Sequence, residues 1–205
     1  MGTQPGEGSL ADLSPLKGMS LNSLNVMNNN VSDLTPLRGM KLEKLMLWSW
    51  WGSDLTPLEG MPLKWLNCGG RRKRLDLTPL VGAPLEYLCV NLTQVSDLAP
   101  LKDMPLTDLL CQNTLVSDLA PLRGMRLQRL HIANSKVSDL APVKGMPLNS
   151  LFIKGTSVID LAPLEDLPLK EIWCDFQAPR DVKILRSIKT LETINDGPAK
   201  LFLQE

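Results

Sequence analysis

The side chains that could perform chemistry in this chain are few and widely spaced. The only histidine is His131, and it is expected to lie on the same face of the protein as Asp108. An imidazole beside a carboxylate could act as a general base, but no set of nucleophile, base and orienting group is visible. The motifs HRD, DFG, GxxxxGK(S/T) and HExxH do not occur. The sequence therefore predicts a protein that is not an enzyme.

The four cysteines have no CxxC spacing, and we interpret them as free thiols rather than as a disulfide framework. Cys68, Cys111 and Cys174 are expected to be buried and to behave as small hydrophobic residues. Cys89 is expected to point outward, which makes it the thiol to test for reactivity. A metal site would require clustered ligands, so neither a metal nor another cofactor is expected.

Aspartate recurs at steps of 21 or 22 residues, and a proline follows three residues after each one. The eight aspartates are Asp12, Asp33, Asp54, Asp76, Asp97, Asp118, Asp139 and Asp160. A repeated carboxylate could suggest calcium, but a segment such as VSDLAP contains no second acidic ligand. We therefore expect each aspartate to cap a turn by accepting a hydrogen bond from a backbone N–H.

This period identifies the chain as a solenoid of stacked repeats. The pattern L-x-x-L-x-(L/V/I/C) starts at eight positions, from Leu21 to Leu169. Its centre suits a short strand with alternating faces, so that Leu151 and Ile153 point inward while Ser150 and Phe152 point outward. The remainder of each unit is too short for a long helix. The prediction is an α/β-type solenoid of short parallel strands with 3-10 or irregular turns on the convex side.

The strand pattern and the DL-x-PL turn together resemble the leucine-rich repeat family, in its short, internalin-like bacterial form. The resemblance covers roughly Leu10 to Trp173 and implies an arc whose strands line a concave face. It also implies a polar residue after each strand, which is found at Asn29, Thr93, Thr114, Ser135 and Thr156. Trp50 and Arg71 depart from that rule, and the single 22-residue step, from Asp54 to Asp76, falls there too.

Three regions are expected along the chain: an incomplete lead-in over 1–11, repeats over 12–168, and a last strand with a C-terminal cap over 169–205. Helical spacing predicts a helix over Pro179 to Lys189, followed by a ninth strand over Leu191 to Ile194. The tail also resembles the ending of repeat blocks in some predicted bacterial serine/threonine kinases. No matching N-terminal cap is visible. The chain is therefore either a fragment or has an exposed first strand edge, which could support self-association.

Composition and charge narrow the possible partners. The formal net charge is zero, which argues against a general coat for nucleic acid or a membrane-steering protein. There is neither an apolar run of 18 residues nor a secretory signal pattern, so a cytoplasmic location without membrane contact is expected, although truncation could hide a leader.

What remains is the surface of the predicted arc. Outward strand positions place an apolar and aromatic group on the concave face: Met46, Trp65, Tyr87, Cys89, Leu110, Phe152 and Trp173. A contiguous exposed group of this kind marks a partner site.

Three of the five tryptophans lie together, at Trp48, Trp50 and Trp51, one repeat before four consecutive cations, Arg71 to Arg74. Residues one period apart are lateral neighbours, so we expect Trp50 beside Arg71 and Trp51 near Arg72, with Trp50 turned inward. The pairing could serve only to hold the bulky loop. It could also form a raised rim of the two residue types most enriched in binding hot spots.

The sequence therefore predicts a non-enzymatic scaffold that binds a protein or peptide through the concave face and this Trp/Arg rim. One alternative is a nucleic-acid or polyanion binder acting through Arg71–Arg74. Another is the detached regulatory segment of a bacterial serine/threonine kinase.

Overall fold

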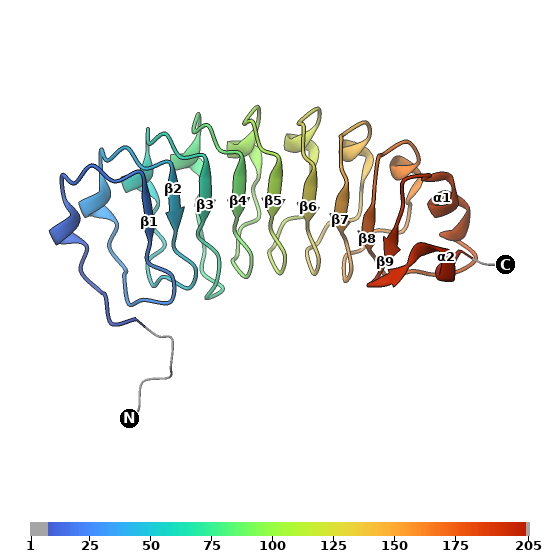
Figure 1. Cartoon of the computed structure of the whole chain (residues 1–205), viewed down its shortest axis with the longest axis horizontal. Coiled ribbons are helices and arrows are strands. Elements are labelled where there is room, and N and C mark those ends of the chain that lie inside the picture. The colour runs from blue at the N-terminus through green and yellow to red at the C-terminus, as the bar shows by residue number, and fades with distance from the viewer. Residues whose placement is uncertain (1–7, 204–205) are drawn as a thin grey trace, which may run out of the picture.

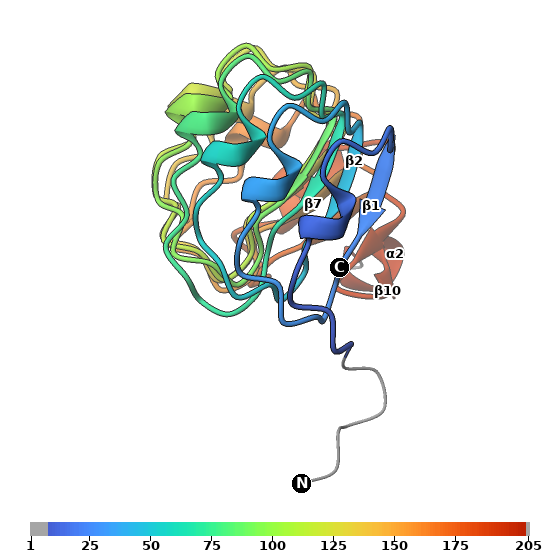
Figure 2. The ribbon, with the colours of Figure 1, turned by 90° about the vertical axis from the view of Figure 1, so that its left-hand side faces the viewer.

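Each repeat contributes one three-residue strand and one 3-10 turn to an elongated solenoid (Figure 1). The computed structural model describes residues 8–203. Eight strands belong to the repeats: β1 (Ser23–Asn25), β2 (Lys44–Met46), β3 (Trp65–Asn67), β4 (Tyr87–Cys89), β5 (Asp108–Leu110), β6 (Arg129–His131), β7 (Ser150–Phe152) and β8 (Glu171–Trp173). Strands and turns lie on opposite sides of each coil (Figure 2).

The strands form one sheet in chain order, and the pairs from β1 to β9 are all parallel. Each central leucine pairs with its counterpart in the next repeat, as Leu109 does with Leu130. The register advances by 21 residues, except by 22 between β3 and β4, where Leu66 pairs with Leu88, and between β8 and β9, where Ile172 pairs with Ile194. The predicted solenoid of short parallel strands is confirmed.

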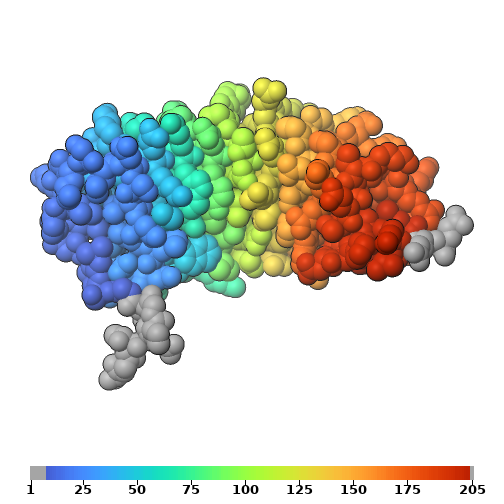
Figure 3. Space-filling model, viewed as in Figure 1, coloured from blue at the N-terminus to red at the C-terminus, as the bar shows by residue number. Residues whose placement is uncertain are grey.

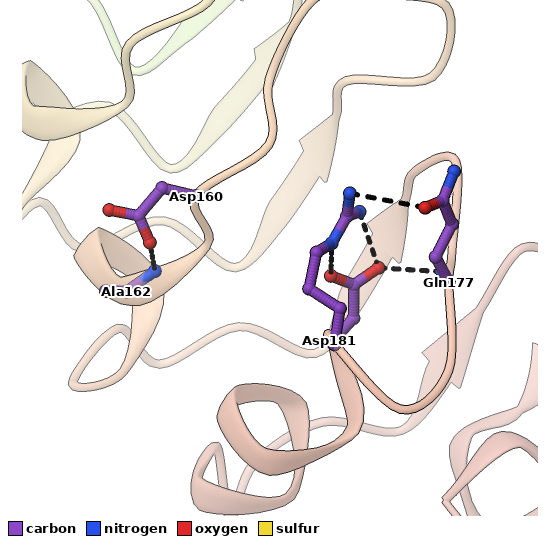
Figure 4. Close-up of polar contacts among 5 residues, drawn as sticks. Asp160, Ala162, Gln177 and Asp181 are labelled. Carbon is purple, nitrogen blue, oxygen red and sulfur yellow. Dashed lines mark hydrogen bonds and ion pairs between the residues drawn. The ribbon is translucent and has the colours of Figure 1, made fainter.

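The side opposite the sheet consists of eight 3-10 turns that stack on one another. They are η1 (Ser14–Leu16), η2 (Thr35–Leu37), η3 (Thr56–Leu58), η4 (Thr78–Leu80), η5 (Ala99–Leu101), η6 (Ala120–Leu122), η7 (Ala141–Val143) and η8 (Ala162–Leu164). Before each turn, an aspartate Oδ1 accepts a hydrogen bond from the backbone N–H two residues on. The bond between Asp160 and Ala162, at 2.8 Å, is drawn in Figure 4. The aspartate column therefore caps turns, as predicted.

The interior is a continuous column of leucines with valine, isoleucine, methionine and cysteine. Burying one such side chain stabilises the fold by about 1.5–3 kcal/mol. The polar residue after the strand is also buried at Thr93, Thr114 and Ser135, and Thr114 Oγ1 donates to the carbonyl of Cys111 at 2.7 Å. The methionine column is buried from Met40 onward, but Met19 is 47% exposed because no earlier repeat covers it among the described residues.

The C-terminal cap has a shorter helix than predicted and two further elements that were not predicted. The helix α1 spans Val182–Ser187 rather than Pro179 to Lys189, and β9 spans only Thr193–Ile194. The buried carboxylate of Asp181 is the reason for the late start. It binds Arg180 and the backbone N–H of Gln177, and these contacts hold the preceding residues in a turn (Figure 4).

The tail then folds back as β10 (Gly197–Pro198), antiparallel to β9, and α2 (Ala199–Phe202). Phe202 packs edge-on against Phe176, with ring centroids 5.6 Å apart. Together these elements close the C-terminal end of the core. The longest helix in the described part has six residues, too few to cross a membrane.

The N-terminal end of the solenoid lies far from this cap (Figure 3). There β1 is the outermost strand of the sheet among residues 8–203. Gly8 donates a backbone hydrogen bond to Asn28, and Asn30 donates one to Leu10, so the chain before β1 runs beside the following loop. Residues 1–7, most of the predicted lead-in, lie outside the described residues. Self-association through this edge stays a prediction.

Candidate binding surface

Two aromatic stacks lie on the strand face of the sheet. The first is on β3 and β4, where the rings of Trp65 and Tyr87 are parallel within 5° and their centroids are 4.4 Å apart. Lys44 on β2 extends this stack, with Nζ 4.7 Å from the centre of the Trp65 ring. In-register parallel pairing creates the stack, because Lys44 pairs with Trp65 and Trp65 pairs with Tyr87.

The second stack is in the neighbouring outward column, on β6 to β8. Phe152 lies between His131, at a centroid distance of 3.9 Å, and Trp173, at 5.3 Å. Trp173 is held by its Nε1–H, which donates to Glu171 at 3.1 Å. Met46 and Leu110 are half-buried in the same column. The predicted aromatic residues therefore form two separate stacks, one toward each end of the arc, rather than one cluster.

A cavity of about 430 Å³ opens above the second stack, with Phe152 and Trp173 among its lining residues. Its polar lining includes Asn134, Lys154 and Asp175. Asp175 also accepts a hydrogen bond from the backbone N–H of Gly155 at 2.7 Å. An apolar floor with a few polar groups at its rim is the usual composition of a binding pocket.

The three clustered tryptophans have three different environments. Trp48 is half-buried and lies against Gly69, where an added Cβ would come within 2.7 Å of its ring. Trp50 is fully buried, with 0% exposure. Trp51 is 58% exposed. The expected inward turn of Trp50 is confirmed, but its proposed contact with a partner is wrong, because no part of its side chain reaches the surface.

The burial of Trp50 depends on Gly52, two residues later. Equivalent positions in other repeats are the buried valines Val31, Val95, Val116 and Val137. At Gly52 a Cβ would lie 2.3 Å from the Trp50 ring and 2.1 Å from the carbonyl oxygen of Ser32. The indole therefore occupies the space that a valine fills elsewhere. Within the described residues its Nε1–H has no hydrogen-bond acceptor.

The cation–aromatic pairs at the rim differ from those predicted. Arg71 stacks on Trp51, with Cζ 3.7 Å from the ring centre, and Lys73 lies over Trp50 at 3.9 Å. The expected pairs of Arg71 with Trp50 and Arg72 with Trp51 are wrong. The two residues are 20 positions apart in the pair of Arg71 with Trp51 but 23 apart in the pair of Lys73 with Trp50, so the path of this loop, and not a uniform shift of the 21-residue spacing, sets the pairs.

Lys73 is the rim residue that the sequence reasoning missed. Its Nζ donates to the carbonyl of Trp50 at 3.0 Å, and burial, followed by repulsion from Arg71, lowers its pKa to about 7. Cys68 acts in the opposite direction. The sequence shows Lys73 as the third cation of RRKR. It does not show the offset between neighbouring loops that places Lys73 over Trp50.

Comparison with known proteins agrees with this geometry. Internalin C2 of Listeria monocytogenes superposes with a TM-score of 0.69 over 84% of this chain and 79% of its own, at 24% identity. The internalin InlF of the same species gives 0.54 over 91% and 71%, at 22% identity. InlJ, whose functional domain includes a cysteine ladder, gives 0.58 over 91% and 45%, at 19%. The chain has the leucine-rich repeat fold of the internalins. No protein-family model and no curated protein matches its sequence.

On this leucine-rich repeat surface, His131 is partly buried and is not hydrogen-bonded to Asp108. His131 Nδ1 lies 3.0 Å from the side-chain nitrogen of Gln112, and burial, followed by repulsion from Arg129, lowers the pKa of its imidazole to about 4. Asp108 pairs with Arg129, at 3.2 Å, rather than with His131. No group of three or more metal-ligating side chains occurs in residues 8–203.

The thiols are equally protected. Cys68, Cys111 and Cys174 are buried as predicted, and burial raises the pKa of each to about 12. Cys89 is also buried, with 3% exposure, so the expectation of an outward, accessible thiol is wrong. Its strand position does face the concave side, but Tyr87 and Leu110 stand beside it in the sheet and shield it from solvent.

Proposed function

We propose that this leucine-rich repeat solenoid recognises a protein or peptide partner and performs no catalysis itself. The partner lies along the concave face and against the rim made by Trp48, Trp51, Arg71 and Arg72. The observation that carries the proposal is the pair of aromatic stacks, whose rings remain half-exposed on the strand face. Aromatic side chains on a surface of this kind are typical of binding hot spots.

The rigidity of the surface supports the same proposal. Each ring is held by an in-register neighbour on the next strand, and Trp51 is held by Arg71. A partner would therefore meet side chains that are already ordered. Binding to preordered groups loses less conformational entropy, which leaves more of the contact energy as affinity.

The test compares partner capture by matched variants. Phe152→Ser and Trp65→Ser each remove one stack, and Val81→Ser removes an exposed apolar side chain that follows η4 on the convex side. Each protein is immobilised, exposed to native lysate and analysed by mass spectrometry, and captured proteins are then purified and measured by calorimetry. Circular dichroism confirms that the variants are folded.

We expect a purified partner to bind wild type and Val81→Ser alike and to bind both stack variants at least about tenfold more weakly, since hot-spot truncations cost about 2 kcal/mol or more. A partner that binds all four proteins equally would contradict the use of the concave face. The alternatives predicted from the sequence give different outcomes. Capture of nucleic acid alone would favour the polyanion binder, and an adjoining kinase reading frame would favour the regulatory segment.

A further inference from the structure

The cations of the rim have no acidic partners in the described structure. Arg71, Arg72, Lys73 and Arg74 are consecutive, and no carboxylate within residues 8–203 lies within 4.0 Å of any of them. The ion pairs of the protein lie elsewhere, for example between Arg129 and Asp108. Four adjacent positive charges without counter-charges produce a strong local potential, even on a chain whose net charge is zero.

Arg71 is fixed in a geometry that leaves its terminal amino groups available. Its Nε–H donates to the carbonyl of Ser49, and its guanidinium plane lies on Trp51. Within the part of the chain that the structure describes, Nη1 and Nη2 make no hydrogen bond. Two parallel N–H donors on a planar, immobilised group match the two oxygens of a carboxylate.

The backbone beneath these arginines is held in an unfavourable conformation. Arg71 and Arg72 both have positive φ, at 63° and 44°, following Gly70 at 92°. The other adjacent pair of this kind in residues 8–203 is Asn195 and Asp196, residue types that tolerate it better. The strained loop is kept in place by backbone bonds from Gly70 to Asn91 and from Arg72 to Leu92. Strain that the surrounding structure maintains is characteristic of functional sites.

The rim differs in charge from the C-terminal part of the concave face. There the charges are mixed, because Glu171 and Asp175 flank Trp173 while Lys154 lines the same cavity. Attraction of acidic residues is therefore expected at the rim rather than along the whole face.

We propose that Arg71, Arg72 and Arg74, the exposed cations at and beside the rim, bind the carboxylates of an acidic segment in the protein partner. This inference rests on the proposed function. A nucleic acid fits the site less well, because base stacking requires open aromatic faces. Trp50 is buried, Trp48 lies against Gly69, and Trp51 already carries Arg71 on its ring.

The test uses random-peptide display selection on the full chain. Wild type is compared with Arg71→Gln/Arg72→Gln and with Arg72→Gln/Arg74→Gln, a second pair that leaves the Arg71 contacts intact. The matched control is Arg123→Gln/Arg126→Gln, which removes the same charge from two exposed arginines at a distant repeat. Enriched peptides are synthesised with their acidic residues intact or replaced by the corresponding amides, and affinities are measured by fluorescence anisotropy.

Peptides enriched by wild type and by the control are expected to carry clustered aspartate or glutamate. Their affinity should fall at least about tenfold for both rim variants and for the amide peptides, because a hydrogen bond between charged groups contributes more than a neutral one. The binding should also weaken as salt concentration rises.

The other outcomes separate this inference from the proposed function. Peptides without acidic bias, which lose affinity for Phe152→Ser but not for the rim variants, would overturn the inference and support the concave face. A rim-dependent single-stranded oligonucleotide, with no acidic peptide bound, would assign the rim to polyanions instead. Folded protein that enriches no peptide would overturn both.

Discussion

Replacing Trp50 by threonine restores the usual residue type of the repeat, yet we expect it to destabilise the protein. Thr93, Thr114 and Thr156 occupy this position in other repeats and donate to the carbonyl three residues earlier, at 2.6–2.7 Å. Trp50 already makes the matching backbone bond to Leu47, so a threonine in its place could form that hydroxyl bond. The loss of unfolding free energy comes instead from the space that the indole leaves, because Gly52 has no side chain to fill it.

The magnitude follows from the volume lost. Truncating a buried tryptophan costs about 3–5 kcal/mol, which for a chain of this size lowers Tm by roughly 6–20 °C. Gly52→Val alone should cost about 1–3 kcal/mol or more, because its Cβ would clash with both the Trp50 ring and the carbonyl oxygen of Ser32. Together the two changes recreate the threonine and valine of the other repeats. The double variant should be less destabilised than the sum of the two single changes, because the Cβ at position 52 no longer meets the indole. A loss remains, since that Cβ would still lie 2.1 Å from the carbonyl oxygen of Ser32 and the contact of Lys73 with the indole is gone.

The assay is urea unfolding followed by far-ultraviolet circular dichroism for wild type, both single variants and the double variant. We expect a coupling energy of about 1–3 kcal/mol, within the range of values for residues in contact. Combining Trp50→Thr with Val137→Ala, several repeats away, provides a control that should be additive. If the double variant is as unstable as the sum of its single changes, the reasoning is refuted. The Trp50 side chain would then not be filling the space that a valine fills in other repeats.

Three further outcomes are expected. The pKa of Asp54 is lowered, first by the hydrogen bond from the Thr56 backbone, so its stabilisation is present above the ordinary value of 3.8 and is lost as pH falls through the lower folded value. Asp54→Asn should therefore reduce Tm at pH 6 and have little effect near pH 2. The amine of Lys73, whose pKa is lowered to about 7, should be acetylated at neutral pH faster than exposed lysines, as mapped by mass spectrometry. Because the unfolded chain binds a proton there up to about pH 10, Tm should rise between pH 7 and 10 in wild type more than in Lys73→Met. The four buried thiols should react with a disulfide reagent only after denaturation, and fast labelling of native Cys89 would contradict its burial.

The helix and strand boundaries were predictable from the sequence in the repeats but not in the C-terminal cap. Repeats of 21 residues predicted each strand and each turn, because every unit presents the same pattern and is packed against copies of itself. The C-terminal cap has no copy to match. There the contacts of Asp181 delay the helix to Val182, and the tail adds the antiparallel strand β10 that helical periodicity could not indicate.

The candidate surface was only partly predictable for a related reason. Alternation along a strand correctly placed Trp65, Tyr87, Phe152 and Trp173 on one face. The repeat spacing also assigned Trp65 and Tyr87 to one outward column and Phe152 and Trp173 to the other, but it could not show that the rings stack as two separate groups. Nor could it show that Cys89 is shielded, because burial at a concave position depends on the size of the lateral neighbours.

The sequence by itself determined the repeat, the direction of each strand residue and the role of the aspartate column, because these depend on a period and on local hydrogen bonding. Only the tertiary structure decided how the three tryptophans are used. In the loop of the 22-residue repeat, Arg71 meets the exposed ring of Trp51 and Lys73 meets the buried ring of Trp50, an arrangement that no uniform shift of the spacing produces. Such pairings depend on angstrom-level offsets between neighbouring coils, which a sequence period leaves undefined where the period itself changes.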